Sequence, residues 1–132
     1  MDIHLRIIGI ALIILGSLHI IFPWYFNWKT ELERLSLVNR QIMQVHTFFI
    51  ALIVLLMGIL CLIAPTELLQ TPLGQVLSFG LAIFWTARLL IQLFGFSPAL
   101  WNGKTFETTI HIIFSGFWTY LSWVFWTIAL SS

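Results

Sequence analysis

The chain has 132 residues, 60% of them hydrophobic and 8% charged, and its mean hydropathy is +1.00. Six basic and five acidic side chains are too few to cover a water-soluble globule with charge, so the composition predicts an integral membrane protein. A formal net charge of +1 without a basic tract argues against nucleic acid as a partner, and the single cysteine, Cys61, excludes an intramolecular disulfide.

Four apolar segments are each long enough to cross a bilayer, whose hydrocarbon core of about 30 Å takes roughly 20 helical residues. The segments cover residues 3–22, 42–63, 75–96 and 108–130. Since an unpaired backbone cannot lie in lipid and the connections are short, these segments predict helices that cross alternately up and down. The expected fold is therefore all-α, a single transmembrane four-helix bundle over residues 1–132 whose first partner is the lipid bilayer.

The first connection, residues 27–41, predicts a short amphipathic helix lying on the membrane surface between the first two spans. Apolar side chains such as Trp28 and Leu32 recur there at helical spacing among charged residues. Thr30, followed three residues later by Glu33, has the pattern of a capping box, which pairs the free amides at the start of a helix.

The basic residues predict how the chain is inserted. Lys29, Arg34, Arg40 and Lys104 would lie at the membrane face shared by the first and third connections, whereas Arg6 would lie at the other face. The positive-inside rule then places the first face in the cytoplasm and both termini outside, as expected for a protein of a bacterial inner membrane.

Three histidines fall on three different spans at the same predicted depth. His19, His46 and His111 each lie about four residues, or about 6 Å, inside the cytoplasmic end of their spans. Imidazole is the commonest metal ligand in proteins, and Glu107, one helical turn before His111, adds a carboxylate. The pattern predicts a site in which these four side chains bind Zn, Fe or Cu, or a haem with two of the histidines as axial ligands.

Polar residues of the third span are expected beside the histidines. Arg88 disfavours insertion of an apolar helix by about 2.5 to 3.5 kcal/mol, so it needs an ion pair, helix-end carbonyls, a bound anion or a route to the cytoplasmic surface. Gln92 lies one turn after Arg88, and Trp85 continues the same helix face by three residues. Together with Asn39 at the mouth of the cluster, these residues form the predicted cofactor-binding part of the site.

The cluster places the predicted functional site at the cytoplasmic end of the bundle. Three classes of function are compatible with it. The first is a metal or haem protein with redox or lipid-related chemistry, such as a membrane-embedded oxidoreductase. The second is a metal-free binding or transport module for a small anionic, hydrophobic or lipid-like ligand, in which transport would require a homo-oligomer. The third is a structural accessory subunit of a larger membrane complex. No nucleophile with a neighbouring base stands out, so the sequence assigns no catalytic residue.

Overall fold

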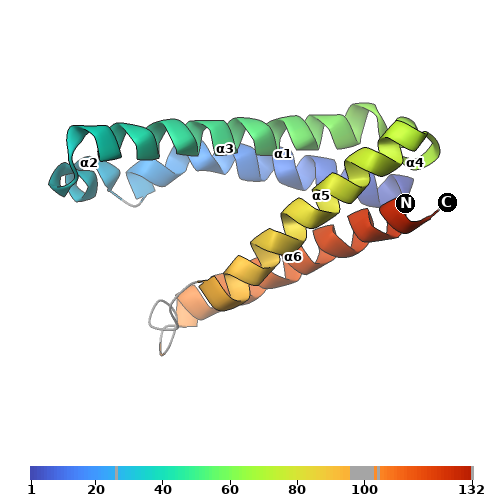
Figure 1. The fold of residues 1–132 in the computed structure, drawn as a ribbon. Coiled ribbons are helices and arrows are strands. Elements are labelled where there is room, and N and C mark those ends of the chain that lie inside the picture. The colour runs from blue at the N-terminus through green and yellow to red at the C-terminus, as the bar shows by residue number, and fades with distance from the viewer. Residues whose placement is uncertain (26, 96–102, 104, 132) are drawn as a thin grey trace. The chain divides into compact units, whose positions relative to one another are not determined.

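The computed structural model describes residues 1–25, 27–95, 103 and 105–131, and every regular element in these residues is a helix (Figure 1). In chain order the elements are α1 (Asp2–Tyr25), α2 (Trp28–Glu31), the 3-10 helix η1 (Leu32–Arg34), α3 (Leu37–Ile63), α4 (Pro65–Gln70), α5 (Pro72–Leu90), the π-helix η2 (Ile91–Gly95) and α6 (Thr105–Leu130). Four segments of this described chain are long and apolar enough to cross a membrane: Asp2–His19, Leu37–Ile63, Pro72–Gly95 and Thr105–Leu130. The all-helical class and the four hydrophobic spans predicted from the sequence are therefore confirmed.

Contacts along the chain divide it into two compact parts, Ile3–Pro65 and Thr66–Ser132, the latter together with Met1–Asp2. We call the part that contains α1, α2, η1 and α3 the first hairpin, and the part that contains α4, α5, η2 and α6 the second hairpin. Each hairpin is described by itself. The single four-helix domain expected from the sequence stays a prediction.

Glycines let α1 and α3 approach each other closely in the first hairpin, where the two helices run side by side (Figure 1). A Cβ atom added to Gly9 would lie 2.8 Å from the carbonyl oxygen of Gly58, and one added to Gly58 would lie 2.7 Å from that of Gly9. Further along α1, a Cβ atom on Gly16 would lie 3.1 Å from the carbonyl oxygen of Ala51. Such close backbone approach is how small residues pack membrane helices, because burial in lipid supplies little drive for helices to associate.

In the first connection, whose pattern predicts a short amphipathic surface helix, the helical residues before α3 are those of α2 and η1, and a position on the membrane surface stays a prediction. Asn27 adopts a left-handed conformation with φ 55° before the single turn of α2, and Thr30 lies within that turn instead of capping it. The 3-10 turn η1 follows, and the Ser36 hydroxyl then starts α3 by accepting a hydrogen bond from the Asn39 amide at 3.3 Å. Because of this cap α3 begins at Leu37, ahead of the predicted start of the span at residue 42.

A capped turn sets the start of α5 in the second hairpin. The Thr71 hydroxyl donates to the Glu67 carbonyl at 2.6 Å and accepts from the Gly74 amide at 2.9 Å. Pro72 occupies the start of the helix, where its fixed φ suits the helical conformation and its missing N–H would have no partner. A side chain on Gly74 would overlap the Glu67 carbonyl, so this turn requires glycine. The helix therefore begins before residue 75, the predicted start of the span.

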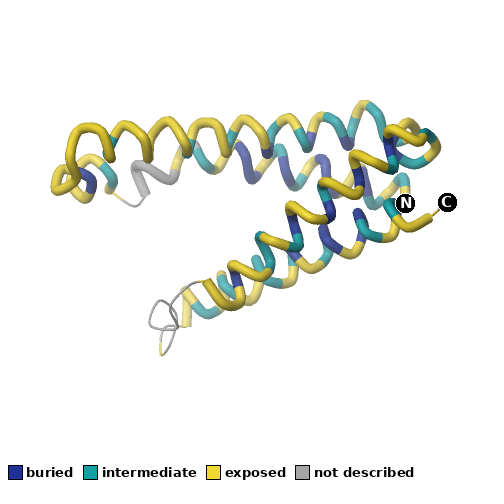
Figure 2. Tube along the Cα trace, viewed as in Figure 1, coloured by how far each residue is buried: buried dark blue, intermediate teal, exposed yellow. Residues whose placement is uncertain are grey.

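The core of the second hairpin lies between α5 and α6, which make its most extensive helix contact. Figure 2 shows buried positions recurring along both helices, as expected when each helix buries one face. The largest buried side chains include Trp85 on α5 and Phe125 on α6. Aromatic side chains therefore fill much of the space between these two helices.

Gly58→Ala is expected to lower the free energy of unfolding by about 1 to 3 kcal/mol, because the added methyl group would meet the backbone of α1. Gly80→Ala, on α5, is the matched control, since no described atom lies within 4 Å of a Cβ at that position. The control change removes only the conformational cost of glycine in a helix, about 1 kcal/mol or less. Equilibrium unfolding in mixed detergent micelles, followed by circular dichroism, measures both variants. Equal stability of the two would contradict the close packing of α1 on α3.

Candidate functional site

A buried amide joins α5 to α6 through the π turn that follows α5. Gln92, only 8% exposed, lies in η2. Its Nε2 donates a hydrogen bond to Nδ1 of His111 at 2.8 Å, and its Oε1 accepts one from Nε1 of Trp118 at 3.3 Å. His111 and Trp118 lie two turns apart on α6 and so occupy the same helix face.

The partners of this amide determine its orientation and the protonation of the histidine. An indole N–H can only donate, so the oxygen of the Gln92 amide must face Trp118. The amide nitrogen then faces His111, whose Nδ1 must accept and therefore carries no proton. His111 is thus a neutral imidazole with its proton on Nε2.

Aromatic rings stack on Trp118, the indole that donates to this amide. The rings of Trp85 and Trp118 are parallel to within 9°, with centroids 5.2 Å apart, and Phe114 stacks on Trp118 with its centroid at 5.5 Å. The Arg88 guanidinium lies over the Trp118 ring, with Cζ 5.0 Å from the ring centroid. A cation–π contact contributes about 0.5 to 2 kcal/mol according to how far it is desolvated, so it offsets part of the cost of about 2.5 to 3.5 kcal/mol for an arginine within a span.

The structure brings together four of the residues predicted for the site, namely Trp85, Arg88, Gln92 and His111. Trp118 is not among the predicted site residues, although it contacts Trp85, Arg88 and Gln92. The sequence signal that could identify Trp118 is its position two turns after His111 on the same apolar helix. Its indole N–H would then face the same neighbouring side chain as the histidine. The sequence pattern treats tryptophan as an apolar residue and misses its N–H group.

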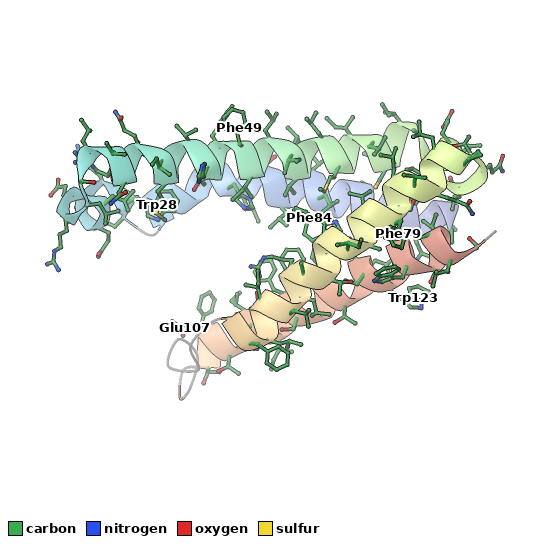
Figure 3. The ribbon with its side chains drawn as sticks, in the orientation of Figure 1. Trp28, Phe49, Phe79, Phe84, Glu107 and Trp123 are labelled. Atoms are coloured by element: carbon green, nitrogen blue, oxygen red, sulfur yellow. The ribbon has the colours of Figure 1, made fainter. Side chains whose placement is uncertain are left out.

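The other predicted site residues are Glu107, His19, His46 and Asn39. Glu107 is exposed in the first turn of α6 (Figure 3). His19, His46 and Asn39 belong to the first hairpin, and of these His46 and Asn39 are exposed. His19 lies within α1, and its Nδ1 donates to the Leu15 carbonyl of the same helix at 2.8 Å.

The metal-binding prediction depends on side chains from both hairpins. Among the described residues, neither hairpin by itself gathers three or more His, Cys, Asp or Glu side chains in a position to hold a metal ion. A common site for His19, His46, His111 and Glu107 therefore stays a prediction. The same holds for a haem with two of these histidines as axial ligands.

The fold and the site define a class of protein. Four long apolar helices are compatible with an integral membrane protein in contact with lipid, and the second hairpin carries a buried polar network between its two long helices. Comparisons of the chain with protein families, with curated protein sequences and with solved structures found no match.

His111 and His19 are expected to be opposite tautomers, because Nδ1 accepts a hydrogen bond in His111 and donates one in His19. Nitrogen-15 NMR of the imidazole rings in detergent-solubilised protein measures this directly, with His111→Gln and His19→Gln variants to assign the signals. We expect an Nε2–H form for His111 and an Nδ1–H form for His19. A protonated Nδ1 in His111 would contradict the proposed orientation of the Gln92 amide.

Proposed function

We propose that the second hairpin binds a small anionic amphiphile, a carboxylate with an apolar tail, at Arg88 and without a metal. The observation that carries this proposal is the Arg88 guanidinium placed over Trp118 inside an apolar span, one helical turn from the Gln92–His111 pair. Ionisable side chains at such depth are rare, and where they occur they usually belong to ligand, ion or proton pathways.

Two further features favour an anionic oxygen at this position. The guanidinium is a planar group with five N–H donors whose geometry fits a carboxylate bidentately. Trp85 is 2% exposed, and its Nε1 has no hydrogen-bond partner among the described residues. A buried donor without a partner is unfavourable by about 1 to 3 kcal/mol, so a ligand oxygen that reached it would gain affinity.

A metal or haem protein is the second candidate, ligated by His19, His46 and His111 with Glu107. It is supported by the hydrogen bond from His19 to the Leu15 carbonyl, because metal-bound histidines commonly donate their other nitrogen in this way. His111 argues in the opposite direction. Ligation of a metal through its Nε2 would place a proton on Nδ1, so Nδ1 and the Gln92 amide nitrogen would both be donors. Reversing the amide would remove this conflict but would turn its NH2 group toward the N–H of Trp118, which is also a donor. The metal-free proposal therefore takes precedence over the metal centre, and also over a purely structural role.

In this proposal the two hairpins assemble in the bilayer as an up-down-up-down four-helix bundle. The positive-inside rule supports an orientation with Lys29, Arg34 and Arg40 in the cytoplasm and both termini outside, in a bacterial inner membrane. Binding requires only the second hairpin, whereas movement of the ligand across the membrane would require a homo-oligomer or a larger complex.

Arg88→Gln is expected to weaken the binding of laurate by about 10- to 100-fold, because hydrogen bonds to a charged group contribute about 1.5 to 3 kcal/mol. Arg6→Gln, which removes an exposed cation of α1, is the matched control and should leave binding unchanged. Equilibrium dialysis of radiolabelled laurate against the full chain in a mild non-ionic detergent measures the affinity. Dodecanol, which has a similar tail and no charge, should not distinguish the variants. Equal laurate affinity in Arg88→Gln and the unmodified protein would refute the proposal.

The metal content distinguishes the two candidates. We expect the full chain, purified without chelators, to contain far less than one metal ion per molecule and to show no Soret absorption band. Elemental analysis and a visible spectrum provide these measurements. Stoichiometric metal or haem that is lost together in His19→Ala, His46→Ala and His111→Ala would favour the second candidate instead.

A further inference from the structure

A groove of about 350 Å³ lies in the first hairpin where α2 and η1 meet the start of α3. The residues that line it include Trp28, Lys29, Glu33, Arg40, Gln41 and Gln44. Figure 3 shows Trp28 at this end of the hairpin. None of these residues belongs to the polar network of the second hairpin, so the groove is independent of the function proposed above.

The groove combines a positive charge with hydrogen-bonding side chains. Lys29 and Arg40 each carry a positive charge and Glu33 a negative one, so the charged lining sums to +1, from two positive and one negative side chain. Lys29 and Glu33 are exposed, and Arg40 is half-buried against the groove. Arginine binds phosphate oxygens bidentately and lysine acts as a mobile point charge, which together suit a singly charged phosphodiester.

The position of the groove along the first hairpin supports a membrane ligand over a soluble one. Arg40 and Gln41 immediately precede Ile42, where the apolar part of α3 starts. Gln44 lies one turn further along α3, only about 5 Å deeper, so the groove lies at the level where headgroups adjoin the hydrocarbon core. Tryptophan is enriched at this level of the membrane, and Trp28 is one of the lining residues.

We infer that this groove binds the headgroup of one anionic phospholipid, with Lys29 and Arg40 at the phosphodiester. The amides of Gln41 and Gln44 supply further donors and acceptors for headgroup hydroxyls. Glu33 opposes additional negative charge, so the groove selects a singly charged headgroup over a multiply charged one. The ligand class is therefore a phospholipid of the phosphatidylglycerol type.

The test compares lipid retention by the full chain in mild detergent, measured by native mass spectrometry with dioleoylphosphatidylglycerol as the probe. The double variant Lys29→Gln with Arg40→Gln is expected to bind this lipid at least about tenfold more weakly, because both phosphate contacts are lost. Arg34→Gln is the matched control. It removes an exposed cation from the same connection that is not among the groove-lining residues, and it should change the affinity by less than about twofold.

Two further variants make the result specific. Glu33→Gln is expected to bind dioleoylphosphatidylglycerol about two- to fivefold more tightly, because it removes a like charge from the groove. Arg88→Gln in the second hairpin should leave lipid binding unchanged, which separates this inference from the proposed carboxylate site. Dioleoylphosphatidylcholine, with the same chains and no net charge, should be retained more weakly.

Three results would overturn the inference. An equal loss of lipid in Arg34→Gln and in the double variant would reveal a non-specific effect of charge. Displacement of the lipid by inorganic phosphate at matched concentration would assign the groove to a soluble anion. Unchanged binding in the double variant, with helicity retained by circular dichroism, would place the lipid elsewhere on the molecule.

Discussion

The hydrogen bonds of the Gln92 amide organise the polar residues of the second hairpin. An amide that is 8% exposed inside an apolar span must find its partners in the protein, because leaving a buried donor or acceptor unpaired is unfavourable by about 1 to 3 kcal/mol. The indole of Trp118 can only donate, so it fixes which end of the amide faces His111. That orientation decides which nitrogen of His111 holds the proton. The chemistry open to the histidine therefore follows from a tryptophan two turns away along α6.

Trp118 links the electrostatic and the apolar parts of the site. Its N–H orients Gln92, and its ring contacts both the Arg88 guanidinium and the parallel ring of Trp85. The cation–π contact, at about 0.5 to 2 kcal/mol, offsets part of the cost of about 2.5 to 3.5 kcal/mol for an arginine within the span. The hairpin can therefore fold with Arg88 in place before any ligand binds. In the proposed function, the interaction energy of a bound carboxylate would then contribute to affinity instead of to folding.

The spans could be predicted from the sequence because length and hydropathy alone decide whether a helix can cross a bilayer. The depth argument groups Arg88, Gln92 and His111 at neighbouring levels, since rise per residue is nearly constant in helices, and the structure has contacts that link these levels in the second hairpin. It could not predict the π turn at Gln92, because apolar periodicity does not report a local widening of the helix. It also gives depth without rotation about the helix axis, so the shared level of His19 and His46 does not establish that their rings face one another. The helical part of the first connection ends at Arg34, because the Ser36 hydroxyl caps a new helix start that the apolar spacing alone does not reveal.

The two hairpins keep their helices together by different means, and the difference explains where a ligand can be held. Glycines in the first hairpin bring the backbones of α1 and α3 so close that a methyl group would overlap a carbonyl oxygen. The described groove of the first hairpin lies away from these glycines, at the end where the connection meets the start of α3. In the second hairpin large rings fill the space between α5 and α6, and space wide enough for an indole pair also admits an amide, an imidazole and a guanidinium. Aromatic packing thus provides the separation that an internal polar site requires, whereas glycine packing restricts the first hairpin to a site at its surface.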